Sequence, residues 1–268
     1  MLSTSPPSFP LFPQTFVQEP KKKDILDYDP ASVVDIALQT LQTAGVELLI
    51  EWGALLYRRM HVPIIIKNFT YLVPDDDLEG ASDILARIGL PLSPPPRFLV
   101  RAEGDFQAKG RFHRITRSTV PFCVQHIALF PLSFSCLLPC EMEEMTPSHI
   151  ISSRCSTILV PRQAAVYTSI LRTMLRYPKA CATRRILESD LSELICYHLL
   201  DLQGGYVDPE DNAAWKELDI CGRLGRATPL VHQWSWDGVW GEGEDWMGDA
   251  LAAVVAGTAD IEYLPSNT

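Results

Sequence analysis

Two short segments constrain the fold of this chain more than any others: residues 51–56, EWGALL, and residues 66–73, IKNFTYLV. The first joins an apolar stretch to a helix-forming stretch through Gly53, and glycine permits backbone angles that other residues avoid. The second is rich in the apolar and aromatic residues that favour a β-strand. Because side chains two positions apart on a strand share a face, we expect Asn68 and Thr70 to project together.

The sequence around these segments predicts an ordered series of elements. A helix is expected from Asp29, an N-cap residue followed by proline, to Gly45. Another is expected after Pro74 and is ended by Gly89. Between them the sequence predicts a strand over 46–50, a short helix over 54–60, and strands over 64–66 and 69–73.

This order resembles the nucleotidyltransferase-like fold family, in its minimal or antitoxin-type form. In that family a strand ends at a small-residue turn that opens a short helix, and the next strand carries Asp-x-Asp. The two carboxylates hold Mg²⁺ on a nucleoside triphosphate. Here the corresponding positions are Asn68 and Thr70, which lack carboxylates. The resemblance therefore implies the fold of the family and argues against its usual chemistry.

A third family carboxylate falls on a later strand. Further strands are expected here over 98–101, 111–117 and 122–130, with a turn region over 104–110. The segment that corresponds to the third acid, VQHI at 124–127, offers Gln125 and His126 instead. All three expected acids are replaced on this alignment, so the sequence predicts no metal ligands and no cofactor.

The second half of the chain predicts a strand over 157–160 and helices over 163–175, from Arg184 onward, and over 245–256. In related nucleotidyltransferases an Arg-x-x-Asp helix follows the catalytic sheet, and its counterparts here are Arg184, Arg185 and Asp190. Two interpretations stay open for them: phosphate contact, or an arginine–carboxylate pair that ties two helices. Aromatic residues Trp234, Trp236 and Trp240 are interpreted as packing residues or, alternatively, as a binding loop.

Charge is distributed unevenly along the chain. Residues 145–187 contain seven basic residues and no acidic one, whereas residues 188–268 contain sixteen acidic and three basic ones. We expect the basic segment to pack in part against the acidic one, with its remaining arginines lining the cleft for an anionic ligand. The net charge of −10 argues against general nucleic-acid binding.

The expected fold class is α+β, a mixed β-sheet of nucleotidyltransferase type with flanking helices. Residues 1–28 are predicted to be a disordered, proline-rich leader, residues 29–160 the α+β domain, and residues 161–268 a helical C-terminal lobe. No apolar run approaches the roughly 20 residues of a membrane span, and the N-terminal residues lack the pattern of a signal peptide. The sequence therefore predicts a cytoplasmic protein without a membrane partner.

The predicted function is that of a catalytically inactive nucleotidyltransferase-like protein, which binds an anionic small molecule or a protein partner in the former nucleotide cleft. The candidate ligand-binding residues are Trp52, Gly53, Ala54, Lys67, Asn68, Thr70, Gln125, Arg184 and Arg185. The alternative is a diverged active transferase, or an accessory enzyme of a specialised pathway, that uses Glu51 or Asp75–Asp77 from a rearranged acidic site. For residues 75–77 helix capping is the favoured interpretation, and the sequence names no catalytic residue.

Overall fold

The computed structural model describes residues 24–120, 123–151, 153–155, 157–203 and 210–266. Within these residues the chain forms a six-stranded mixed sheet with the order β3-β4-β2-β1-β6-β5. The strands are β1 (Ile50–Trp52), β2 (Asn68–Val73), β3 (Arg111–Arg114), β4 (His126–Pro131), β5 (Met142–Met145) and β6 (Ile158–Pro161). The expected α+β class, a mixed sheet flanked by helices, is confirmed.

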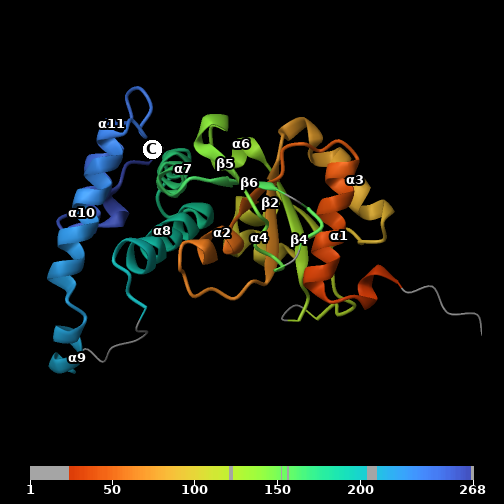
Figure 1. The fold of residues 1–268 in the computed structure, drawn as a ribbon, viewed down its shortest axis with the longest axis horizontal. Coiled ribbons are helices and arrows are strands. Elements are labelled where there is room, and N and C mark those ends of the chain that lie inside the picture. Colours follow the sequence, from red (N-terminus) through yellow and green to blue (C-terminus); the bar gives the residue numbers. More distant parts are fainter. Residues whose placement is uncertain (1–23, 121–122, 152, 156, 204–209, 267–268) are drawn as a thin grey trace, which may run out of the picture.

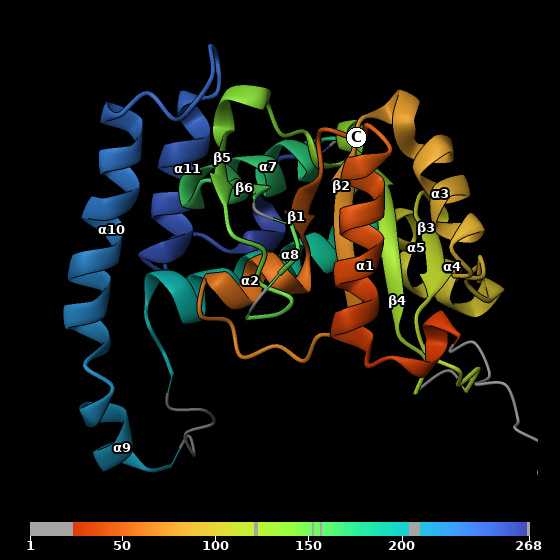
Figure 2. The same cartoon turned by 45° about the vertical axis from the view of Figure 1, so that its right-hand side comes forward.

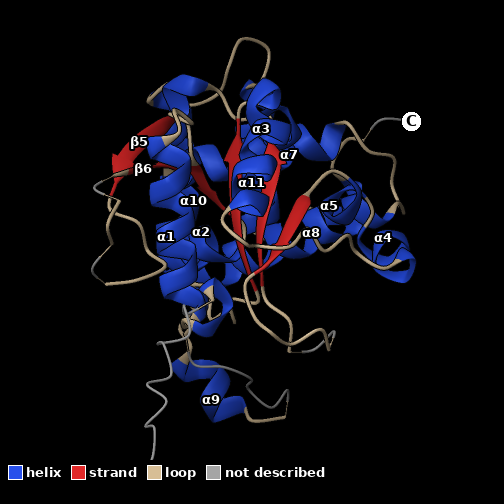
Figure 3. Ribbon diagram, turned by 90° about the vertical axis from the view of Figure 1, so that its right-hand side faces the viewer, coloured by secondary structure: helices blue, strands red, loops and turns tan. Residues whose placement is uncertain are grey.

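Helices lie on both sides of the sheet (Figure 3). They are α1 (Pro30–Thr43), α2 (Ala54–Arg59), α3 (Leu78–Arg87), α4 (Arg97–Glu103), α5 (Asp105–Ala108), α6 (Leu132–Ser135), α7 (Gln163–Leu175), α8 (Ala182–Leu194), α9 (Asn212–Glu217), α10 (Ile220–Trp236) and α11 (Asp245–Val255). Short turns are η1 (Ile25–Asp27), η2 (Asp75–Asp77), η3 (Pro139–Glu141) and η5 (Ile261–Tyr263), and a π-helical turn, η4 (Ile195–Leu199), extends α8. In the described parts of the chain, no helix combines the length and apolar character that a membrane span needs.

The helices separate into groups along the molecule. Figures 1 and 2 show α1 and α3 on one side of the sheet and α7 and α8 on the other, with α10 and α11 beyond them.

The termini of α1 match the sequence expectation: Asp29 accepts a 3.0 Å hydrogen bond from the Ser32 amide, and the helix ends just before Gly45, whose φ is +91°. Its apolar face is buried against the sheet and α3.

Strand register decides which side chains share the cleft face of the sheet. β1 pairs antiparallel with β2, which places Trp52 opposite Thr70. β2 pairs parallel with β4, which places Asn68 opposite His126. β3 pairs antiparallel with β4, so Phe112 lies on the same face as these four residues. β6 pairs parallel with β1 and antiparallel with β5 and completes the sheet.

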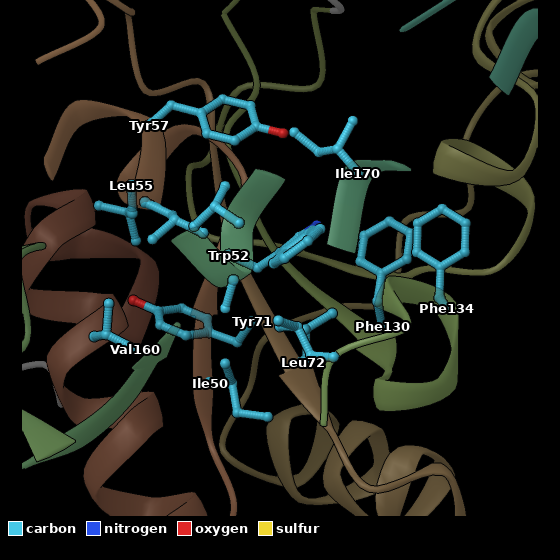
Figure 4. Packing of buried hydrophobic residues seen from close by; sticks show 14 of the residues in the cluster. Ile50, Trp52, Leu55, Tyr57, Tyr71, Leu72, Phe130, Phe134, Val160 and Ile170 are labelled. Atoms are coloured by element: carbon cyan, nitrogen blue, oxygen red, sulfur yellow. The ribbon is translucent and has the colours of Figure 1, made fainter. Parts of the chain in front are cut away.

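One hydrophobic cluster runs from the sheet into the C-terminal helices. It contains Leu72 of β2, Val166 of α7 and Leu251 of α11. The rings of Phe130 and Phe134 lie next to each other in this cluster, with centroids 5.4 Å apart (Figure 4). The helical C-terminal part therefore shares its core with the sheet across the boundary expected at residue 160.

Some local expectations are wrong. Residues 64–66 form no strand, and the expected strand over 98–101 is helix α4, which follows the extended residue Pro96. Residues 105–108, within the expected turn region, form α5. Strand β5 was not expected, because its sequence, MEEM, lacks the apolar alternation of a half-buried strand.

Helix α10 was not expected either, because Gly222, Gly225 and Pro229 lie inside it and all disfavour a helix. The packing interpretation of the tryptophans is confirmed for Trp234 and Trp240, which are buried. It is wrong for Trp236, which is 78% exposed.

The predicted leader is only partly described, since residues 1–23 lie outside the described residues. Residues 24–28 are ordered by the 3-10 turn η1, which Asp24 caps. Arg117 forms ion pairs with Asp27 at 2.6 Å and with Asp24 at 3.3 Å. The prediction of disorder is therefore wrong for residues 24–28, which an arginine from beyond β3 holds in place.

Candidate functional site

Two adjoining cavities open on the cleft face of the sheet. The large cavity, of about 550 Å³, lies between β2, β4 and the segment before α4, and the small cavity, of about 200 Å³, lies between β1, β2 and α8. Both are lined by Asn68, Glu103, Gln107 and Phe112. We call the two cavities together the cleft.

The small cavity is built around the turn between β1 and α2. Gly53 begins α2 with φ +61° and ψ −135°, a backbone conformation that favours glycine. A Cβ atom at this position would lie 3.4 Å from the Cβ atom of Thr70. The expected arrangement is confirmed: Gly53 lies at a strand-to-helix turn beside β2, and Trp52, Gly53, Ala54, Asn68 and Thr70 all line this cavity.

Two uncharged side chains of β2, Asn68 and Thr70, face the cleft. Asn68 and Thr70 share a face of β2, and the Oδ1 atom of Asn68 lies 3.2 Å from Nδ1 of His126 on β4. The candidate Gln125 is wrong as a cleft residue, because its side chain donates instead to the Ile66 carbonyl and lines neither cavity. The cleft residue is its neighbour His126, since adjacent strand residues face opposite ways.

The large cavity combines two cationic side chains and one acid, Glu103, with an apolar wall. Its cationic side chains are Lys67 and Arg114, and its apolar wall is supplied mainly by Phe112, the proline-rich segment 91–96 and neighbouring residues. Burial, followed by the charges of Lys67 and Arg114, lowers the pKa of His126 to about 4. His126 is therefore neutral at physiological pH, and the cavity favours a negative charge beside it.

The small cavity is lined by acidic and aromatic side chains and by no cationic one. Its charged residues are Glu103 and Asp190, and aromatic rings of Trp52, Phe106 and Phe130 are part of its wall. The hydroxyl group of Tyr57 donates a 2.8 Å hydrogen bond to Oδ2 of Asp190.

Burial of Asp190 outweighs this hydrogen bond. The pKa of the Asp190 carboxyl is raised to about 7, mainly because the group is buried. The hydrogen bond from Tyr57 acts to lower this pKa, and the charge of nearby Glu193 acts to raise it. Asp190 was considered from the sequence only as a partner of the arginines. The structure makes it a cleft residue.

Arg184 and Arg185 are wrong as cleft residues. Arg184 is fully buried, and its guanidinium donates to the carbonyl groups of Met174 at 2.7 Å and Pro265 at 2.8 Å. It also pairs with Glu188 one turn along the same helix. Arg185 is exposed and donates to the Ala180 carbonyl. Arg184 therefore ties α8 to the end of α7 and to the C-terminal segment.

The basic segment 145–187 contributes none of its arginines or its lysine to either cavity, and its Ile186 lines the small one. Its contact with the acidic C-terminal part is present at Arg172, which pairs with Glu244 and with Glu141, each at 2.7 Å. Together with the Arg184–Glu188 pair, this contact gives the expected packing of unlike charges, whereas the expected lining of the cleft by arginines of this segment is wrong.

The acids considered for a rearranged site have other roles. Glu51 is fully buried on the opposite face of β1, where it accepts hydrogen bonds from Arg59 and from Ser148. Asp75 accepts a bond from the Ser133 amide at the start of α6 instead of capping its own helix. Among the residues that the structure describes, no three His, Cys, Asp or Glu side chains are grouped to hold a metal ion.

Sequence reasoning missed several cleft residues, namely Glu103, Gln107, Phe112, Arg114 and the proline-rich segment. A strand was expected over 98–101 in place of α4, so neither this helix nor the segment before it was expected to face β2. The chain was then compared with models of protein families, with curated proteins and with solved structures, and no match was found in any of them.

Proposed function

We propose that this protein is a non-catalytic, nucleotidyltransferase-like protein that binds a small amphipathic anion in its cleft. One observation carries the proposal: the large cavity combines Lys67 and Arg114 with an apolar wall. Pockets for small molecules are largely apolar and have a few polar groups that fix the orientation of the ligand. An anion with an apolar body fits this combination of charge and surface.

The absence of paired carboxylates is the argument against nucleotidyl transfer. Asn68, Thr70 and neutral His126 occupy the cleft face where the family has its metal-binding acids. A neutral amide and a hydroxyl do not offset the charge of a divalent cation, and transfer of a phosphoryl group depends on that metal. We therefore expect no Mg²⁺- or Mn²⁺-dependent turnover of nucleoside triphosphates. Turnover that persists through purification to homogeneity and disappears in Asp190→Asn would refute the non-catalytic part of the proposal.

Binding is tested with phenyl phosphate, and phenol serves as the uncharged comparison. Calorimetric titration should show phenyl phosphate binding more tightly than phenol, and Arg114→Gln should weaken phenyl phosphate about tenfold through loss of one charged hydrogen bond. Arg101→Gln is the matched control, because Arg101 is exposed on α4 and lines neither cavity. Equal affinity for phenol and phenyl phosphate, or equal losses in the two variants, would contradict anion binding at Lys67 and Arg114.

A further inference from the structure

The charged groups of the small cavity are all acidic, whereas the large cavity combines Glu103 with Lys67 and Arg114. The acids of the small cavity are Glu103 and Asp190, and neither Lys67 nor Arg114 lines it. The two residues come from different helices, α4 and α8, so their approach is a product of the tertiary fold. A positively charged group is the occupant that such a cavity would stabilise.

Aromatic rings add a second, independent preference for a cation. Trp52 and Phe130 from the sheet and Phe106 from α5 line the same cavity as the two acids. The face of an aromatic ring attracts a cation, most strongly for tryptophan, and an alkylated ammonium is accommodated best because it also fills apolar space. A Mg²⁺ ion, in contrast, needs about six oxygen ligands and does not gain from apolar walls.

Asp190 also has an acceptor atom available. Its Oδ2 atom receives the hydrogen bond from Tyr57, whereas its Oδ1 atom accepts no hydrogen bond from any described residue. A bound ammonium group beside this carboxylate would offset its charge.

We propose that the small cavity binds an organic ammonium group and that Asp190 selects it. This proposal rests on the proposed function, since the same cleft would hold the anionic group of the ligand at Lys67 and Arg114. The ligand class is therefore a zwitterion with an apolar linker, oriented with its ammonium between β1 and α8 and its anionic group beside β4.

The test uses choline and its uncharged isostere 3,3-dimethylbutan-1-ol, which has the same shape with carbon in place of the charged nitrogen. At about pH 8, calorimetry should show choline binding at least about tenfold more tightly than the isostere. In Asp190→Asn this preference should fall to about threefold or less. Glu193→Gln is the matched control, since it removes the same charge from an exposed site on the same helix, outside the cavity, and should keep the preference.

The pH dependence provides a second readout. The groups that act on Asp190 are Tyr57 on α2 and Glu193 on α8, and Glu103 lines the same cavity. Because the carboxyl must be ionised to bind the cation, choline should bind about tenfold more weakly at about pH 6 than at about pH 8. In Asp190→Asn the affinity should be nearly the same at both pH values. If that variant does not fold, Glu103→Gln takes its place and should lower the preference for choline.

The two proposals fail in different ways. Choline that binds no better than its isostere overturns the ammonium site, and it leaves the proposed function standing if phenyl phosphate still binds through Arg114. The ammonium site is also overturned if both Asp190→Asn and Glu103→Gln keep the preference for choline over its isostere. Choline binding without any phenyl phosphate binding would instead overturn the proposed function and retain a cation site.

Discussion

The Tyr57 hydroxyl donates a 2.8 Å hydrogen bond to Oδ2 of Asp190, and these residues lie 133 positions apart in the sequence. The bond joins α2, the helix that Gly53 begins, to α8 in the C-terminal part of the chain. It fixes one wall of the small cavity. The C-terminal helices therefore complete the cleft as well as the core.

Asp190 should make stability depend on pH. The folded protein retains the proton of this carboxyl up to about pH 7, whereas an unfolded chain releases it near the usual pKa of 3.8. The unfolded state thus binds fewer protons between these values, and this group's contribution to the free energy of unfolding falls as pH rises through them. His126 and His198, each with a pKa lowered to about 4 by burial, act in the opposite direction up to pH 6.5.

The variant Asp190→Asn isolates the carboxyl from the histidines. Urea unfolding at about pH 5 and about pH 8 should show that the variant gains stability relative to the wild type as pH rises. Glu193→Gln, on the same helix, should show a much smaller change. A constant difference between wild type and Asp190→Asn at the two pH values would contradict the raised pKa of Asp190.

Gly53→Ala should destabilise the protein through the backbone. Gly53 has φ +61°, which a residue with a Cβ atom rarely adopts, so we expect a loss of about 1 to 3 kcal/mol. Gly80→Ala is the control, because Gly80 lies inside α3 and a Cβ atom there meets nothing within 4 Å. That variant should be stabilised by up to about 1 kcal/mol. Urea midpoints that move in the same direction for both would refute the requirement for glycine at residue 53.

The sequence predicted those parts of the cleft that depend on neighbouring residues. The turn at Gly53 and the shared face of Asn68 and Thr70 follow from local backbone geometry, and both are found. The helix over 97–103 was mistaken for a strand because it is short and its stability comes from packing on α8, more than eighty positions later. Its position could not be read from local propensity.

Arg184 shows the same limit for a charged residue. Its sequence context suggested phosphate contact or a carboxylate pair that ties two helices, but its partners include the Leu264 and Pro265 carbonyls near the end of the described chain. Lys67 was a correct cleft candidate, since it immediately precedes the β2 residue Asn68. Arg114 was missed because the pairing of β3 with β4, not the sequence pattern, brings it to the same cavity.

Arg184→Met should destabilise the protein by about 3 kcal/mol or more, because it leaves buried carbonyl groups without a donor. Limited proteolysis should then cut the C-terminal segment around residues 261–266 faster than in the wild type. Arg185 is the exposed neighbour, and the variant Arg185→Met should change neither the stability nor the rate of cleavage appreciably. Similar losses in the two variants would contradict the anchoring role of Arg184.

Glu51→Gln should also be costly, although Glu51 lies outside the cleft. Its buried carboxylate accepts hydrogen bonds from Arg59 and Ser148, and loss of one partner of a buried ion pair costs about 3 to 5 kcal/mol. Glu79→Gln removes an exposed partner of Arg111 and should cost less than about 1 kcal/mol. Thermal unfolding of both variants measures the difference. Comparable losses would show that the Glu51 pair is no more important than a surface contact.

His126 should report directly on an anion in the large cavity. Its pKa is lowered to about 4 by burial and then by Lys67 and Arg114, so an anion that offsets these charges should raise it. His198 is the internal control, because burial also lowers its pKa to about 4 but it lines neither cavity. NMR titration of the histidine ring protons, with and without phenyl phosphate, should show that the ligand raises the pKa of His126 and leaves the pKa of His198 unchanged. An unchanged pKa of His126, or an equal shift in the pKa of both histidines, would exclude anion binding beside Lys67 and Arg114. A charge at that position must affect the pKa of His126 more than that of His198.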